Sequence, residues 1–379
     1  MTTLWHRLAA ILGRASFSML GSVYLREGSY ARLSATGYAL VMAVGAAWLA
    51  GAAWIAWRLW RRRRSPVAAG GVLFAAAAAY LTLAYPPTTD EPHYLALTES
   101  LVADGDVRLA REYGSGALRK FYPTAAIDPH VVITPDGEMF SQHTLGLPLL
   151  QLPAYALGGR WGVAAAAAIA AVLLLAALLG LCRDAGIPER AAAVCVGALA
   201  TTAPLLFGST LVFTEVPAAA LVAVGLRGAL AGPGWTGPLA GALLPWLHPR
   251  YALLSLGLAA VRWRRGRLGA AEAGGWAVAG GLSGALFLGA YHGPALTAVL
   301  NVLTERYPAR LEDLNAASLA GFAFGNPLAG ALGKLFDRDF GVVPYAPWLL
   351  AAAWGAAAAR GARVPWGALG LAGGAYLLV

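Results

Sequence analysis

Long apolar stretches of about 17 to 25 residues recur along most of the 379-residue chain. That is the length an α-helix needs to cross roughly 30 Å of hydrocarbon. Hydrophobic residues make up 59% of the chain and charged residues 12%, with a mean hydropathy of +0.61. Within lipid the backbone must satisfy its own hydrogen bonds, which favours helices. The sequence therefore predicts an all-α polytopic membrane protein with spans at about 36–57, 66–85, 161–182, 191–213, 216–231, 273–291 and 342–359.

Arginine runs at the ends of these stretches predict the orientation of the spans. The densest run, Arg58 and Arg61 to Arg64, follows the first span and should lie in the cytoplasm. The segment 86–145 is then delivered to the periplasmic or extracellular side, and the later arginine runs, including those near Arg183 and Arg262, return to the cytoplasm. A net charge of +9 concentrated in such runs fits membrane topology better than a nucleic-acid partner.

The expected domain organisation is a lead-in and one transmembrane domain. Residues 1–35 are predicted to be an interfacial helix or a disordered segment, and residues 36–379 to form the helical bundle. A second external region is expected at 292–341, and the last apolar segment reaches Val379, which suggests truncation at the carboxy end. Residues 237–261 are too long for one span and contain prolines near His248 and Arg250, so a broken helix or a shallow hairpin is expected there.

The external segment 86–145 holds nine of the 19 acidic residues and three of the six histidines. Asp90 and Glu91 precede a predicted helix that runs to about Asp104. Its apolar residues recur at helical spacing, so we expect an amphipathic helix lying on the membrane surface. The acidic pair is either functional or only caps the helix and favours its positive dipole end.

Other polar residues are candidates for binding. Glu215 stands at the external end of a span, where it either faces a polar cavity or lies in interfacial water. His143 opens the return to the bilayer and is either a ligand for phosphate or sugar or an interfacial residue. The turn-forming Asp104-Gly105-Asp106 lacks the glutamate of a calcium loop, so a plain turn is the better interpretation.

Five short segments follow one another along about residues 66 to 360: TTDEPHY, SQHTLGLPLL, TEVP, LPWLHPRYALL and LFDRDFGVVPYAP. Their order resembles the GT-C superfamily of integral-membrane glycosyltransferases, which includes protein O-mannosyltransferases and lipid A aminoarabinose transferases. It implies a GT-C-like bundle with short helices on a long external loop. It also implies transfer of a sugar from a polyprenyl-phosphate carrier to a glycan, lipid or protein acceptor on the outer face of the membrane.

The resemblance also implies roles for individual residues. Asp90 matches the catalytic base, Glu91 its neighbour and Glu215 a second acid, while Arg250 matches a residue that approaches the carrier phosphate. Some members use a divalent cation at the acidic pair, so a cation there is a candidate cofactor. His143 departs from the family, where several relatives have lysine. Further candidates for binding sugar or phosphate are His93, Lys120, His130, His248, Asp337 and Arg338.

Two other functions compete with the glycosyltransferase. A transporter or flippase of lipid-linked sugars would share the lipid-facing architecture, but it predicts inverted repeats and acidic residues at the middle of the membrane. We find no inverted repeat in the sequence, and the spans between the polar regions contain almost no acids. A non-catalytic membrane scaffold would leave Asp90 and Glu215 far apart.

Overall fold

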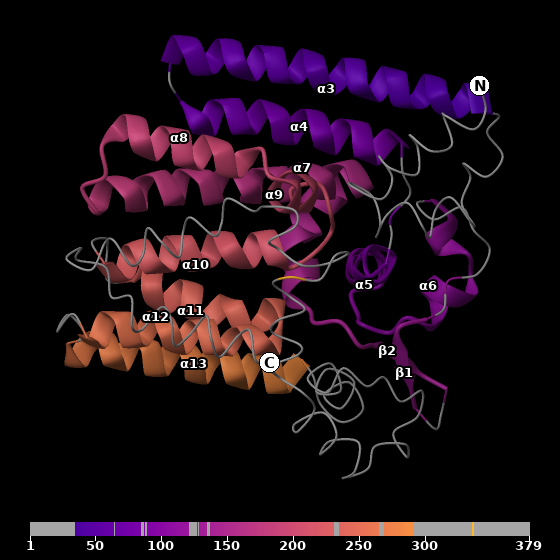
Figure 1. The fold of residues 1–379 in the computed structure, drawn as a ribbon. Helices are drawn as coiled ribbons and strands as arrows, with labels where there is room; N and C mark the ends of the chain where they lie inside the picture. Colours follow the sequence, from indigo (N-terminus) through magenta and orange to yellow (C-terminus); the bar gives the residue numbers. More distant parts are fainter. Residues whose placement is uncertain are drawn as a thin grey trace.

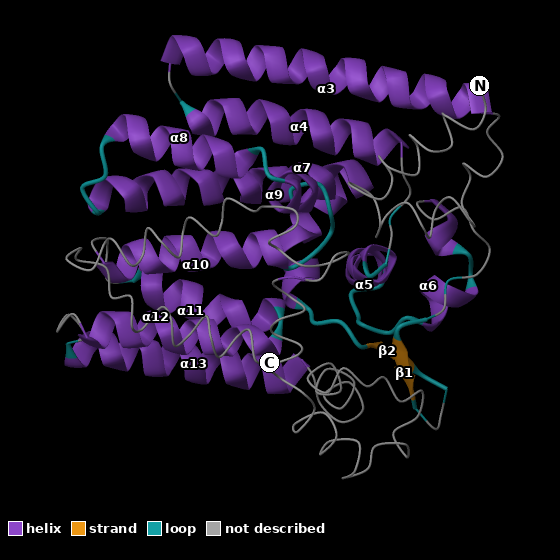
Figure 2. Cartoon of the chain, in the orientation of Figure 1, coloured by secondary structure: helices purple, strands orange, loops and turns teal. Residues whose placement is uncertain are grey.

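A computed structural model describes residues 35–290, apart from 64, 85–86, 88, 121–126, 128, 135–136, 231–234 and 265–268, together with Phe336. The described chain is mostly helical, as predicted (Figure 1). One departure from an all-α fold is a short antiparallel pair of strands, β1 (Val131–Ile133) and β2 (Met139–Ser141), beside the helices (Figure 2). The predicted lead-in, the external region 292–341 and the spans beyond it lie outside the described residues, Ala35 and Phe336 excepted.

Three long helices form one side of the bundle: α3 (Ala35–Arg63), α4 (Pro66–Ala84) and α7 (Gly146–Asp184). Small residues let α4 and α7 approach closely. A side chain at Gly70 would meet Leu175, and buried alanines of α7 complete the contact with Phe74. By length and composition, two of the described helices are apolar enough to cross a membrane, α4 through Pro66–Leu83 and α7.

Helix α7 is longer than its predicted span because it contains a kink. Gly159 adopts φ 54° and ψ −137°, a combination open mainly to glycine, and Pro153 lies one and a half turns before it. A side chain at Gly162 would collide with the carbonyl of Ala154. The kink at Gly159 divides α7 into two parts. The first part begins at the polar end of the molecule, and the second part is rich in alanine and leucine and lies within the bundle.

The prediction of one span over 191–213 is wrong. The structure has two shorter helices, α8 (Glu189–Ala200) and α9 (Ala203–Gly208). Thr201 and Thr202 end α8 by donating their hydroxyl hydrogens to the carbonyls of Ala198 and Leu199. Pro204 sits in the first turn of α9, where a missing N–H is tolerated but a continuing helix is not.

The remaining bundle consists of α10 (Glu215–Leu230), α11 (Thr236–Leu247), η3 (Pro249–Tyr251), α12 (Ala252–Arg264) and α13 (Ala270–Ala290). The expected break in 237–261 is confirmed as a helical hairpin. His248 is extended (φ −163°, ψ 136°) between α11 and η3, and the Ser255 hydroxyl donates to the carbonyl of Gly241 across the hairpin. The break places His248 and Arg250 at the tip of two packed helices.

The segment between α4 and α7 gathers at one end of the bundle (Figure 1). It contains α5 (Glu91–Ala103), α6 (Ala110–Gly114), η2 (Ala117–Lys120) and the two strands. Helix α5 starts at the predicted position, but the expectation of an amphipathic surface helix is wrong. All residues from Glu91 to Thr98 are buried, and Leu95 and Leu97 belong to an apolar core shared with α7 and α11.

The opposite end of the bundle carries the joins from α3 to α4 and from α7 to α8 (Figure 1). Arginines that follow long helices pair there: Arg227 lies 2.8 Å from Asp184, and Arg183 lies 3.5 Å from Glu189. Arg262 is buried and donates to the carbonyl of Gly228 near the end of α10. The two ends of the described bundle therefore differ in chemistry, with these arginines at one end and the histidine-rich segment at the other.

Candidate functional site

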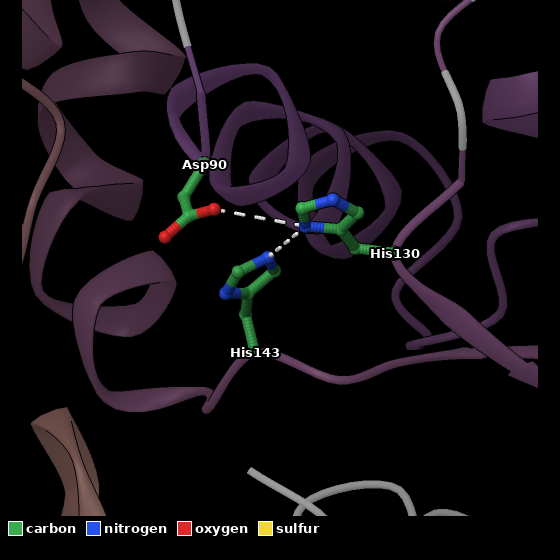
Figure 3. A group of neighbouring side chains, drawn as sticks. All are labelled: Asp90, His130 and His143. Carbon is green, nitrogen blue, oxygen red and sulfur yellow. Dashed lines mark hydrogen bonds and ion pairs between the residues drawn. The ribbon is translucent and has the colours of Figure 1, made fainter. Parts of the chain in front are cut away.

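Asp90 immediately precedes α5, yet its side chain makes no capping hydrogen bond to that helix. Its backbone carbonyl accepts from the N–H groups of His93 and Tyr94, each at 3.1 Å. The carboxylate instead extends toward His130, with Oδ1 3.6 Å from Nδ1 (Figure 3). Asp90 therefore occupies the N-cap position of α5, but its side chain does not cap the helix by a hydrogen bond.

The turn that leads into Asp90 has an unusual backbone. Thr89 has φ 48°, a left-handed conformation that is rare for a β-branched residue and costs about 1–2 kcal/mol. Strained residues of this kind cluster at functional sites, where the surrounding structure maintains them. Here the strained residue lies directly beside the carboxylate at the centre of the site.

The two strands bring His130 and His143 together. His130 precedes β1 and His143 follows β2, and the N–H of Gln142 donates to the carbonyl of His130, which extends the hairpin by one step. As a result Nδ1 of His130 lies 3.3 Å from Nε2 of His143. The N–H of Gly137 donates to the carbonyl of Thr134 at 2.9 Å between the two strands.

His93 completes a group of three imidazoles. Its ring stacks on His130, with centroids 3.9 Å apart and planes at 14°, and lies 5.7 Å from the ring of His143. Nδ1 of His93 lies 2.6 Å from the hydroxyl of Tyr113. Tyr113 was missed by sequence analysis because nothing local to it indicates a contact 20 residues away.

Burial changes the ionisation of this group. Burial, aided by the nearby charges of His130 and His143, lowers the pKa of His93 from 6.5 to about 2. Burial likewise lowers the pKa of His143 to about 3. Burial raises the pKa of Asp90, and the positive charges of His130 and Arg250 partly oppose that rise. Near neutral pH the buried imidazoles of His93 and His143 are therefore neutral, and the Asp90 carboxylate is more basic than usual.

Glu91 has a different role from Asp90. Its side chain is buried, and Oε1 accepts the N–H of Val212 at 2.9 Å. It thereby ties the start of α5 to the segment that leads into α10. The prediction that Glu91 is catalytic, and the expectation of a cation shared by the acidic pair, are not supported by this arrangement, because that oxygen already serves a buried backbone amide.

Glu215 and Arg250 form an ion pair near Asp90. Nη2 of Arg250 is 3.7 Å from Oε1 of Glu215, and the Arg250 charge also acts on Asp90. The hydroxyls of Thr214 and Tyr251, 3.1 Å apart, fix the start of α10 to η3. The structure therefore brings Asp90, Glu215 and Arg250 into one neighbourhood, although they are more than 100 residues apart at the extremes.

His248 supports the position of Arg250. Its Nδ1 accepts the backbone N–H of Arg250 at 3.2 Å. The hydroxyl of Thr144 donates to the carbonyl of Leu247 at 2.6 Å, which joins the hairpin end to the α11–η3 break. Gly146 makes this possible, because a side chain there would meet the carbonyl of Trp246.

The other predicted binding residues are not placed in the site. Lys120 ends η2, but its side chain lies outside the described structure, as do Asp337 and Arg338. The Asp104–Asp106 turn is structural, as expected: Oδ1 of Asp106 accepts the Ser100 hydroxyl and the N–H of Arg108. No protein-family model, curated protein or solved structure matches the chain.

Proposed function

We propose that this protein is an integral-membrane glycosyltransferase of the GT-C type, which transfers a sugar from a polyprenyl-phosphate carrier to an acceptor hydroxyl on the non-cytoplasmic face. The observation that carries the proposal is the position of Arg250, which pairs with Glu215 and acts electrostatically on Asp90. One base and one cation in a single neighbourhood are what this reaction needs from a protein.

Asp90 serves as the general base. Its side chain is about half exposed and is not used as a helix cap, so it is accessible to an acceptor. Asp90 takes the proton from the acceptor hydroxyl, and that oxygen attacks the anomeric carbon of the sugar. The bond between the anomeric carbon and the phosphate oxygen breaks, and the electron pair leaves with the polyprenyl phosphate. Desolvation raises the pKa of Asp90, which makes the carboxylate a stronger base.

Arg250 binds the departing phosphate. A guanidinium offers several N–H donors that match phosphate oxygens, and the helical break places this one on a short, fixed η3 turn. Glu215 holds the side chain through the 3.7 Å pair. Tyr251 adds a second restraint, since Arg250 lies over its ring at 5.7 Å. The cation is therefore oriented before the donor binds.

The distribution of charged residues supports an outward-facing site in a multi-pass membrane protein. The arginines that follow α7, α10 and α12 lie at the end of the bundle opposite Asp90 and the histidines. Lysine and arginine are enriched on the cytoplasmic side of membrane proteins. By this rule we expect the proposed active site to lie on the outer face, where a lipid-borne donor is accessible.

The test is a transfer assay with purified protein reconstituted in liposomes. A panel of polyprenyl-phosphate sugars is the donor set, and release of polyprenyl phosphate is measured together with formation of glycosylated product. We expect Arg250→Ala to reduce turnover strongly and Arg250→Lys to retain part of it. Absence of transfer from every donor, or movement of the donor across the bilayer without transfer, would reject the proposal; the second result would favour a flippase.

A further inference from the structure

Three potential metal ligands, Asp90, His130 and His143, converge beside the start of α5. Each offers one oxygen or nitrogen atom, and these atoms all lie within 4.8 Å of one another. Two of the separations are 3.6 Å, from Asp90 to His130, and 3.3 Å, between the imidazoles. Figure 3 shows one ring nitrogen of His130 facing both a nitrogen of His143 and one oxygen of Asp90, whose other oxygen is directed away.

These separations match the edge of a metal tetrahedron. Zinc binds imidazole nitrogen and carboxylate oxygen at about 2.0–2.2 Å, and tetrahedral ligand atoms at that radius are about 3.3–3.6 Å apart. Magnesium and calcium prefer sites made wholly of oxygen atoms. Two imidazoles and one carboxylate therefore favour zinc over the hard cations.

We propose that Asp90, His130 and His143 bind one Zn²⁺ ion. Three protein ligands leave a fourth position for water or a substrate oxygen, as in catalytic zinc sites, whereas structural zinc sites are closed by four protein ligands. The proposal goes beyond the glycosyltransferase function and replaces the expected acidic pair with a different ligand set. It does not depend on sugar transfer, because zinc binding is measured without a donor.

The surroundings hold the ligands in place. His93 stacks on His130 at 3.9 Å, and Tyr113 engages Nδ1 of His93 at 2.6 Å. Tyr113 also hydrogen-bonds to the backbone of His130. His93 and Tyr113 are therefore positioning residues, which orient a metal ligand through packing and hydrogen bonding. The backbone of His143 is held by its N–H, which donates to the Ser141 hydroxyl oxygen at 2.9 Å.

The experiment uses the full-length protein in detergent, stripped with a chelator and dialysed. Isothermal titration with Zn²⁺ and elemental analysis measure affinity and stoichiometry, and Co²⁺ serves as a spectroscopic probe of tetrahedral coordination. We expect one zinc per chain. Asp90→Asn, His130→Gln and His143→Gln should each weaken binding by more than the roughly 10- to 100-fold cost of changing a residue that only orients a metal ligand. Glu138→Gln, on the same hairpin segment but outside the ligand set, should bind as the wild type.

Folding is monitored in the same samples. Zinc should raise the melting temperature of the wild type and of Glu138→Gln but not that of the ligand variants. His143 is buried, so the His143→Gln variant can fail to fold. In that case the zinc affinity of Asp90→Asn, a nearly isosteric change at a half-exposed position, tests the proposal. A folded wild type that binds no zinc at micromolar concentration, or an Asp90→Asn variant that binds it normally, would overturn the proposal. Zinc bound without any transfer would count against the glycosyltransferase function only.

Discussion

Oδ1 of Asp90 lies 3.6 Å from Nδ1 of His130, so the carboxylate at the head of α5 is directed into the strand hairpin and not onto its own helix. The contact joins residues 40 positions apart. One carboxylate oxygen of Asp90 faces His130, and the other is directed away from it (Figure 3). The predictions below test this division of roles.

Substitution of Asp90 by asparagine should nearly abolish transfer and leave the fold intact. General-base assistance is typically worth about 10²- to 10⁴-fold in rate, and the side chain contributes no capping bond that the change would remove. Turnover in the liposome assay, together with expression level and melting temperature, measures both expectations. Glu138→Gln is the matched control, and wild-type turnover in Asp90→Asn would exclude Asp90 as the base.

Glu91 should tolerate glutamine but not alanine. The glutamine carbonyl oxygen can still accept the N–H of Val212, whereas alanine leaves that buried donor unsatisfied, at a cost of about 1–3 kcal/mol. Thermal unfolding should therefore separate the two variants, with Glu91→Gln close to wild type in stability and in transfer rate. Loss of transfer in a stable Glu91→Gln protein would instead show that Glu91 takes part in the chemistry.

Gly146→Ala should destabilise the protein and disturb the site. The added methyl group would collide with the backbone of Trp246, where α7 begins beside the end of α11. Overpacking of this kind costs about 1–3 kcal/mol, and the shift would separate His143 from the segment that carries Arg250. Gly284→Ala, in an open part of α13, is the control and should leave stability unchanged or slightly higher. Equal melting temperatures for the two variants would contradict the close approach.

Stability of the metal-free protein should fall as the pH drops below 6.5. The folded protein lowers the pKa of His93 to about 2 and that of His143 to about 3, so both imidazoles stay neutral while their counterparts in the unfolded chain take up protons. The stabilising contribution is complete above pH 6.5 and is lost progressively toward pH 3, at up to about 1.4 kcal/mol per pH unit for each residue.

Denaturant unfolding between pH 7.5 and 4, with a chelator present, measures this slope. His93→Gln removes one of the imidazoles that burial keeps neutral and should give a shallower slope than the wild type over the same range. A slope unchanged by that substitution would show that His93 is not held neutral by the fold.

The sequence predicted some elements well because their causes are local. The span at 66–85 corresponds closely to α4, and proline near His248 marks the break between α11 and η3. The division of 191–213 was missed because Thr201, Thr202 and Pro204 lie within otherwise apolar sequence, where length alone suggested one span. The burial of α5 was missed for a related reason: its polar residues bond to distant partners, as Thr98 does with Gln151, and no local pattern reveals them.

The candidate site shows the same limit. Asp90 and Glu91 are adjacent acids that sequence alone cannot tell apart, and only their contacts with His130 and Val212 separate them. The approach of His130 to His143 depends on pairing between two strands of three residues each. Such short strands give only a weak alternating pattern, so the sequence did not predict them.

The pairing of Val131 with Ser141 also fixes how far apart the two flanking histidines can be. In a strand pair, a slip of one residue turns each side chain to the other face, so a change of alignment would point one imidazole away while leaving the sequence of every ligand intact. The register of the hairpin therefore sets the distance between His130 and His143. Insertions or deletions between residues 134 and 138 should therefore change the separation of the two histidines, because they would shift the pairing of the strands.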